Sequence, residues 1–200
     1  MSINRNRHLK TILFFSLVFS VNYAMATTPE EIVFNTTQEV INRLDADKTR
    51  LQEEPEYIQT IVKQLIVPHL DFTTMASITL GDKWNVLTEN EKSCFSLGFK
   101  NLLVERYAFV LLSYRQQNIS YQSAKPIGEK DIISIRQVLT RPNVKPLTIE
   151  YPMKPDADSW KVIDLVIDDV SLLRNYRKMF NSEIREQGLL GFIYNFQECN

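Results

Sequence analysis

The segment VIDLVIDDVSLLRNYRKMF, residues 162–180, joins two kinds of sequence pattern and so decides the class of fold. Its β-rich beginning continues the run SWKV and predicts a strand over residues 159–167. Its apolar residues then recur every three or four positions, which predicts a helix over residues 171–187. A strand is therefore expected to lead directly into an amphipathic helix at this point of the chain.

Three more strands are predicted upstream of this junction. Residues 119–124, 131–140 and 147–153 are rich in β-branched and aromatic side chains, and turn residues such as Pro126 and Pro142 separate them. Links this short between neighbouring strands favour antiparallel pairing. We therefore expect a four-stranded antiparallel sheet in the second half of the chain.

Helix signals dominate the first half of the chain. The tetrapeptides TPEE, residues 28–31, and TENE, residues 88–91, each match the capping box that begins a helix. Pro55 and Asp71 begin two shorter predicted helices between them, and Gly81 ends the second. Helices first, then a sheet and a final helix, predict an α+β domain in which a helical layer packs on the four-stranded antiparallel sheet.

The long helix that begins at residues 88–91 is predicted to run to about Tyr114. Its segment YAFVLL, residues 107–112, is apolar on every side, and such a helix is buried on more than one side. It is expected to lie between other elements or beside an internal apolar space. We expect this helix and the C-terminal helix, residues 171–187, to cover one face of the sheet.

The first 26 residues have the features of a secretory signal peptide. Three basic residues precede a ten-residue apolar run, residues 12–21, which is too short to span a bilayer as a helix. Ala24-Met25-Ala26 then matches an A-x-A cleavage site. Cleavage after Ala26 is expected to leave residues 27–200 as a single exported domain.

Composition disfavours nucleic-acid binding and catalysis. The leader holds three of the 23 Lys and Arg residues and none of the 24 Asp and Glu residues, so the mature chain has a net charge of −4. A mildly acidic chain without a basic run is a poor nucleic-acid binder. His69 is the one histidine of the mature chain. The mature chain contains no C-x-x-C, P-loop or G-x-S-x-G motif. We therefore predict no catalytic residue, no metal site and no cofactor.

Cys94 and Cys199 are the two cysteines of the sequence. Export permits a disulfide between them, but two cysteines do not make a disulfide scaffold. Because Cys94 lies within an apolar helical pattern, we expect a buried free Cys94 and an exposed Cys199 in the tail.

Three aspartates in the opening segment raise the question of a metal or acid–base site. If residues 159–167 form a strand, the backbones of Asp164 and Asp168 lie about 13 Å apart, too far to share a metal. Asp168 and Asp169 then fall in the turn before the helix, where carboxylates suit its free N–H groups, although Ser171 competes for that role. Asp164 is expected to face solvent or to pair with Arg136.

Four stretches of the chain resemble the MlaC/toluene-tolerance family. VPHLDFTTMASITLGDKW, residues 67–84, resembles its pattern P-h-x-D-F-x-x-M-[SA]-x-x-x-L-G-x-x-W, where h is an apolar residue. CFSLGFKNLLVERYAFVLLSY, residues 94–114, and the segment 162–180 resemble further family patterns, but Asp169 stands where glycine is usual. EQGLLGFI, residues 186–193, resembles the family ending, with Leu190 in place of a polar residue. The resemblance covers nearly the whole mature chain.

The resemblance implies a periplasmic phospholipid carrier with no enzymatic activity and with phospholipid as its cargo. Its implied partners are an inner-membrane ABC-transporter complex with an MCE-domain subunit and an outer-membrane lipoprotein–porin complex, between which it shuttles lipid and so maintains the lipid asymmetry of the outer membrane. The implied fold is a nuclear-transport-factor-like one, with an internal apolar cavity between the helical layer and the sheet. We expect such a carrier to be a monomer.

The expected cavity residues follow from the helix and strand patterns in this fold. Arg177, a basic residue beside the apolar stripe of the C-terminal helix, is a candidate contact for a head group or a partner. A strand face is uncertain, because a one-residue error in register exchanges the two faces. The expected cavity residues are Val104, Tyr107, Leu111, Ile133, Ile135, Leu147, Ile149, Tyr151, Val166, Tyr176 and Phe180.

Two other functions compete with a lipid carrier. A small periplasmic enzyme could use a cavity of this kind, with Asp164 or Asp71 as its acid or base. A structural protein of the cell envelope would carry no small molecule. Phospholipid that co-purifies with the protein distinguishes the carrier from both alternatives.

Overall fold

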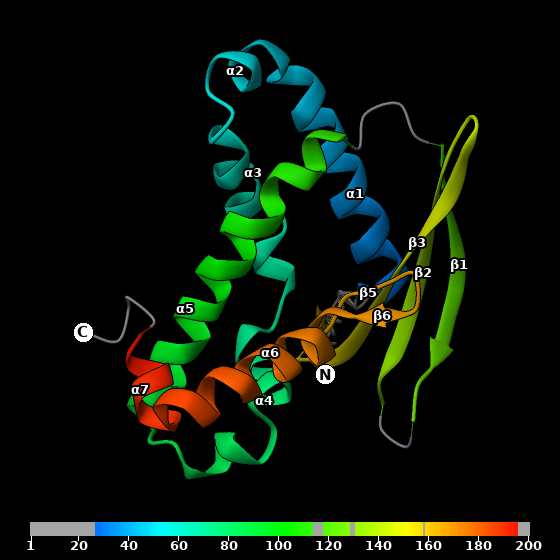
Figure 1. The fold of residues 1–200 in the computed structure, drawn as a ribbon. Coiled ribbons are helices and arrows are strands. Elements are labelled where there is room, and N and C mark those ends of the chain that lie inside the picture. Colours follow the sequence, from blue (N-terminus) through cyan, green and yellow to red (C-terminus); the bar gives the residue numbers. More distant parts are fainter. Residues whose placement is uncertain (1–26, 114–117, 129–130, 158, 196–200) are drawn as a thin grey trace, which may run out of the picture.

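The computed structural model describes residues 27–113, 118–128, 131–157 and 159–195, and the predicted signal peptide lies outside this part of the chain. A helical layer lies beside one antiparallel sheet, so the predicted α+β class is confirmed (Figure 1). Within the described ranges, every helix is too short or too polar to span a bilayer.

Three helices begin at the predicted capping residues, whereas the helix predicted to begin at Pro55 begins at Tyr57. Thr28 and Glu31 form one capping box, and Thr88 and Glu91 form the other. The Asp71 side chain accepts a hydrogen bond from the Thr74 N–H at the start of its helix. The α-helices of this half are α1 (Pro29–Ala46), α2 (Lys48–Glu53), α3 (Tyr57–Leu65), α4 (Phe72–Leu80) and α5 (Glu89–Tyr107), and the short 3₁₀-helices are η1 (Val67–His69), η2 (Gly81–Val86) and η3 (Ala108–Ser113).

The predicted long helix changes its winding before Tyr114. The α-helical part, α5, ends at Tyr107, and η3 continues the chain as a 3₁₀-helix. A 3₁₀-helix has three residues per turn, so Ala108 and Leu111 face the same side, while Phe109 and Val110 are 40% and 50% exposed. The segment is therefore not enclosed all round, but it lies beside an internal apolar space, which is one of the two predicted positions: Tyr107, Ala108, Val110 and Leu111 line an apolar cavity.

The sheet has six strands, not the predicted four. The predicted strand 159–167 is interrupted after Val162, and both of its parts pair with the same neighbour, β3. The Leu165 carbonyl in the interruption accepts a 2.8 Å hydrogen bond from the N–H of Leu172, which satisfies it outside the sheet. The strands are β1 (Asn118–Pro126), β2 (Ile133–Arg141), β3 (Val144–Asp156), β4 (Ser159–Val162), β5 (Val166–Ile167) and β6 (Val170–Ser171), paired in the order β1-β2-β3-β5-β6, with β4 also paired to β3.

The helix that packs directly on the sheet is α1, not α5 or the C-terminal helix. Ile32 and Val33 of α1 form one apolar cluster with Ile135, Met153 and Val162 of the sheet. The C-terminal helices α6 (Leu172–Gln187) and α7 (Leu189–Tyr194) instead lie with α4 and α5 at the end of the helical layer (Figure 1). The aromatic stripes of α5 and α6 contact each other, which removes their need for a partner in the sheet.

Five rings fill the space between α5, α6 and α7, and we call them the aromatic core. Neighbouring ring centroids lie between 4.8 Å and 6.0 Å apart, and most pairs meet edge-on or tilted, as aromatic pairs prefer. All five side chains are buried. The members of the aromatic core are Phe95, Phe99, Tyr176, Phe180 and Phe192.

Cys94 lies at the edge of this region, and the expectation of a free thiol there was wrong. Cys94 is disulfide-bonded, and it is the single cysteine of the described residues. Cys199, the other cysteine of the sequence, lies outside them.

Candidate functional site

A cavity of about 230 Å³ lies between α1, α3, the C-terminal part of α5 and the inner face of the sheet. Most of the described side chains that line it are aliphatic, and none of these is a carboxylate, lysine or arginine. The cavity therefore suits an apolar guest. Its polar side chains are Thr36, Thr37, His69, Tyr107, Gln137 and Tyr151.

The periodicities of a helix and of strands bring these side chains together. Residues of α1 at three- and four-residue spacing, such as Val33, Thr37 and Val40, line one side of the cavity. Alternate residues of β3, Ile149 and Tyr151, line the opposite side, because successive strand side chains point to opposite faces. The same local patterns that define the elements thus define the walls.

The structure brings five of the expected cavity residues together on the wall. These side chains come from α5, η3 and β3. They are Val104, Tyr107, Leu111, Ile149 and Tyr151. Contact between these residues and a lipid stays a prediction.

The structure places the other six expected residues elsewhere. Ile135 lies in the cluster between α1 and the sheet, with Ile133 packed against that cluster, and Leu147 lies further along β3 from the wall. Tyr176 and Phe180 lie in the aromatic core, because α6 packs on α5 and not on the sheet.

Val166 shows the effect of strand register. It pairs with Glu150, whereas Ile167 pairs with Ile149, which lines the cavity. Partners in a sheet share a face, so Ile167 lines the cavity and Val166 points away from it. The interruption after β4 shifts the alternation that a continuous strand would have.

Several wall residues carry no signal that identifies them from the sequence. The stripe of α1 is visible as an apolar helix face, but its partner is not. Gln137 is polar, so it resembles a solvent-facing strand residue, yet it is only 1% exposed. Its burial follows from its place on the inner face of β2.

The buried side-chain amide of Gln137 is hydrogen-bonded through both its nitrogen and its oxygen. Its Nε2 donates to the Thr37 Oγ1 at 3.0 Å and to the Tyr121 hydroxyl at 3.3 Å, and its Oε1 accepts from the Tyr151 hydroxyl at 2.8 Å. These bonds connect α1 with three strands and leave the cavity wall neutral. A satisfied polar group of this kind costs far less than an unpaired one.

His69 lies on the cavity wall at the end of η1. Burial lowers the pKa of this imidazole, and the positive charge of Lys161 lowers it further. The histidine is therefore neutral at neutral pH, in keeping with an uncharged wall.

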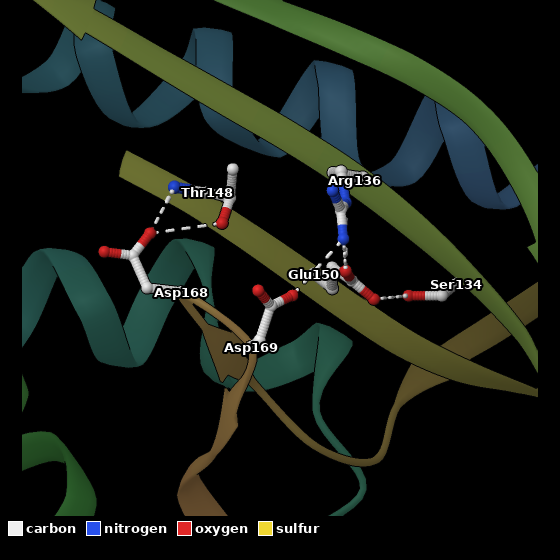
Figure 2. A network of polar contacts seen from close by, with 6 residues as sticks. All are labelled: Ser134, Arg136, Thr148, Glu150, Asp168 and Asp169. Carbon is white, nitrogen blue, oxygen red and sulfur yellow. Dashed lines mark hydrogen bonds and ion pairs between the residues drawn. The ribbon is translucent and has the colours of Figure 1, made fainter. Parts of the chain in front are cut away.

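Asp168 and Asp169 do not cap the C-terminal helix. They form the two-residue turn between β5 and β6, and both have positive φ angles. Asp168 accepts hydrogen bonds from the N–H and the hydroxyl of Thr148 at 3.0 Å and 3.1 Å, and Asp169 lies 3.5 Å from Arg136 (Figure 2). The cap of α6 is Ser171, whose Oγ accepts from the Arg174 N–H.

Asp164 neither faces solvent nor pairs with Arg136, which is bound to Glu150 instead (Figure 2). Its carboxylate accepts hydrogen bonds from the Ser171 hydroxyl at 2.6 Å and from the N–H groups of Leu165 and Leu173. Burial raises the pKa of Asp164, and these hydrogen bonds offset part of that increase. Asp164 thus holds the start of α6. In the described part of the chain, no group of three metal-ligating side chains lies close enough together to bind a metal.

Arg177 contacts the end of α4. Its guanidinium donates a hydrogen bond to the Ile78 carbonyl and lies against Gly81, whose φ is +61°. A side chain at Gly81 would meet this guanidinium at 3.3 Å, so glycine suits the position on both counts. A contact of Arg177 with a head group or partner stays a prediction.

Known proteins resemble this chain over most of its length. The intermembrane phospholipid transport system binding protein MlaC of Haemophilus influenzae is 25% identical over 175 residues, which cover 86% of this chain and 82% of that protein. The toluene tolerance protein ttg2D of Pseudomonas putida is 23% identical over 82% of this chain and 76% of that protein.

A solved structure shares the fold. The phospholipid-binding protein from Ralstonia solanacearum, in complex with a phospholipid, matches with a TM-score of 0.73 at 24% identity, over 84% of this chain and 94% of that chain. The family model described as MlaC protein matches residues 35–198, which include almost every element described above. The chain therefore belongs to the MlaC protein family.

Proposed function

We propose that this protein is a periplasmic phospholipid carrier that holds the acyl chains of its cargo in the apolar cavity. The observation that carries the proposal is the uncharged, largely aliphatic wall of a cavity of about 230 Å³. A protein of the same fold, from Ralstonia solanacearum, was solved with a phospholipid. Lipid chains would gain about 0.8 kcal/mol for each methylene removed from water.

The proposal extends to the transport route. The predicted signal peptide would deliver residues 27–200 to the periplasm as a monomeric domain. There the protein would exchange phospholipid with an inner-membrane MCE/ABC-transporter complex and an outer-membrane lipoprotein–porin complex, and so maintain outer-membrane lipid asymmetry. The name of the Haemophilus influenzae relative, a binding protein of an intermembrane phospholipid transport system, supports this route.

The positions of the two candidate acids favour a carrier over an enzyme. Asp71 is bound to Lys154 and Thr74 at the start of α4, and Asp164 is bound to backbone N–H groups at the start of α6. Neither carboxylate lines the cavity. Each therefore has a structural role that accounts for it without catalysis.

Native mass spectrometry of protein purified from the periplasm tests the proposal. We expect a mass increase that matches a phospholipid, which organic extraction removes. The delipidated protein should melt at a lower temperature and recover on addition of phospholipid, because a ligand that binds only the folded state stabilises it. Absence of lipid in repeated preparations, together with equal melting temperatures, would contradict the proposal.

A further inference from the structure

One hydroxyl at the border of the cavity lacks a partner. Among the described residues, the Tyr176 hydroxyl is the buried side-chain polar atom that makes no hydrogen bond, and the residue is only 4% exposed. An unmet buried polar group normally costs stability. Phenylalanine would fill the same place in the aromatic core without that cost, so the hydroxyl needs an explanation.

The ring of Tyr176 is fixed by its neighbours. It meets the ring of Phe99 edge-on at a centroid distance of 5.3 Å and that of Phe180 at 5.3 Å. The hydroxyl itself lies beside Tyr107. Burial raises the pKa of Tyr176, and the nearby phenol of Tyr107 raises it further, although no hydrogen bond of ordinary geometry joins the two.

Tyr107 connects this hydroxyl with the cavity. It lines the cavity and also packs against the aromatic core. Helical side chains lean toward the N-terminus of their helix, so Tyr107 at the end of α5 reaches back toward Phe99 and Tyr176. A polar group on the cavity side of Tyr107 would thus lie next to a pair of phenols.

Three other polar groups of the wall, Thr37, Gln137 and Tyr151, are joined by hydrogen bonds. Thr37 donates its hydroxyl proton to the Val33 carbonyl, Gln137 donates to Thr37, and Tyr151 donates to Gln137. The two adjacent phenols, Tyr107 and Tyr176, have no such bond among those that join described residues. Where the wall meets the aromatic core, it therefore offers the Tyr107 hydroxyl as a hydrogen-bond donor.

We propose that the Tyr107 hydroxyl donates a hydrogen bond to an ester carbonyl oxygen of the bound phospholipid, and that the Tyr176 hydroxyl donates to Tyr107 and positions it. The inference rests on the proposed function. Acyl chains contain no acceptor, and the ester carbonyls are the acceptors nearest to them. A phosphate is charged and calls for Lys or Arg, and no lysine or arginine of the described part of the chain lines the cavity. A small movement of Tyr107 satisfies both phenols when lipid binds.

Removal of the acceptor from the ligand and of the donors from the protein tests this arrangement. The probes are a diacyl phosphatidylcholine and the dialkyl ether phosphatidylcholine of the same chain length, which lacks both carbonyls. We expect the delipidated wild-type protein to bind the ester lipid about two- to tenfold more tightly, the range of one neutral hydrogen bond. Tyr107→Phe, Tyr176→Phe and the double variant should each bind the two lipids equally. Tyr194→Phe, a change at an exposed tyrosine, should keep the wild-type preference.

The delipidated variants give an independent measurement. Tyr176→Phe should melt at the wild-type temperature or above it, because it loses no hydrogen bond within the fold. A lower melting temperature would show that the hydroxyl is already bonded there and would overturn the inference. Equal affinity of the wild-type protein for both lipids, or a preference that survives Tyr107→Phe or Tyr176→Phe, would overturn it as well. In those cases the carrier function stands, whereas a wild-type protein that binds neither lipid contradicts both.

Discussion

Helix α5 contributes to two apolar regions that differ in how they are filled. Its first half places Phe95 and Phe99, both fully buried, in the aromatic core, where five rings occupy the space. Its last turns place Val104 and Tyr107 on the wall of a cavity of about 230 Å³. The same helix therefore serves a packed core and an open one. Apolar character predicts burial in both regions, but the size and aim of the facing side chains decide whether space remains.

The largest expected effect comes from removing a ring of the aromatic core. Phe99→Ala should lower the free energy of unfolding by about 3–5 kcal/mol, because the ring contacts Phe95, Tyr176 and Phe180 and leaves a cavity behind. Urea unfolding of the delipidated protein measures this loss. Leu111→Ala, on the half-buried cavity wall, is the comparison and should cost clearly less. Equal losses would show that the two regions are packed alike.

A matched pair of alanines tests the same difference by adding volume. Ala76 lies in the filled cluster around the aromatic core, and Ala108 lies on the cavity wall, and both are buried. Ala76→Leu should cost about 1–3 kcal/mol by overpacking. Ala108→Leu should leave the stability of the delipidated protein nearly unchanged, because the added atoms enter open space, and should weaken phospholipid binding. Calorimetry with and without phospholipid measures both effects, and a reversed order would contradict the assignment of the cavity.

A smaller, pH-dependent effect on the unfolding free energy is expected at Asp71. This residue caps the start of α4, the helix that carries the cavity residues Phe72 and Met75. Burial raises the pKa of Asp71, but its bonds to Lys154 and Thr74 lower it by more, so the pKa lies below its ordinary value of 3.8. The unfolded chain then binds the proton more tightly, so the stability from Asp71 is present above the ordinary pKa and is lost as the pH falls below it. Asp71→Asn should reduce the acid sensitivity of the unfolding free energy, measured between about pH 2 and pH 6.

Asp164 provides the control of opposite sign. Burial raises its pKa above the ordinary value, so its contribution to stability is present at low pH and declines as the pH rises through the folded-state pKa. In the wild-type protein, Asp164 makes the unfolding free energy decline as the pH rises toward neutral. Asp164→Asn should remove this decline, whereas Asp71→Asn should remove an increase over the same direction of pH. Identical pH profiles for the two variants would contradict the roles assigned to these carboxylates.

The smallest effect is expected on the outer face of the sheet, away from both regions. Asp169 has a φ of +65° in the two-residue turn between β5 and β6, a conformation that favours glycine. Asp169→Gly should stabilise the protein by about 0.5–1 kcal/mol, although it loses the exposed contact with Arg136 (Figure 2). Asp169→Ala loses the same contact but keeps the strained backbone, so it should not stabilise. A stabilised alanine variant in chemical unfolding would contradict this explanation.

The site could be predicted in part, because the spacing of apolar residues in α5 and β3 shows which face of each element is apolar. Val104 and Ile149 follow from these local patterns, and both line the cavity. Val166 does not line it, because an interruption that no local signal marks shifts the alternation by one residue. Gln137 was missed because its polarity argues for solvent, whereas its hydrogen bonds to Thr37, Tyr121 and Tyr151 allow it to be buried.

Local patterns in the sequence are enough to predict the class of fold, the helix starts at Thr28 and Thr88, and the resemblance to a family. Capping and periodicity act over a few residues, so the chain encodes them locally. The tertiary structure alone decided that α1 covers the sheet, that Asp164 holds the start of α6, and that one apolar region is filled and the other open. A pattern states which face of an element is apolar, but the packing of elements far apart in the chain determines what faces it.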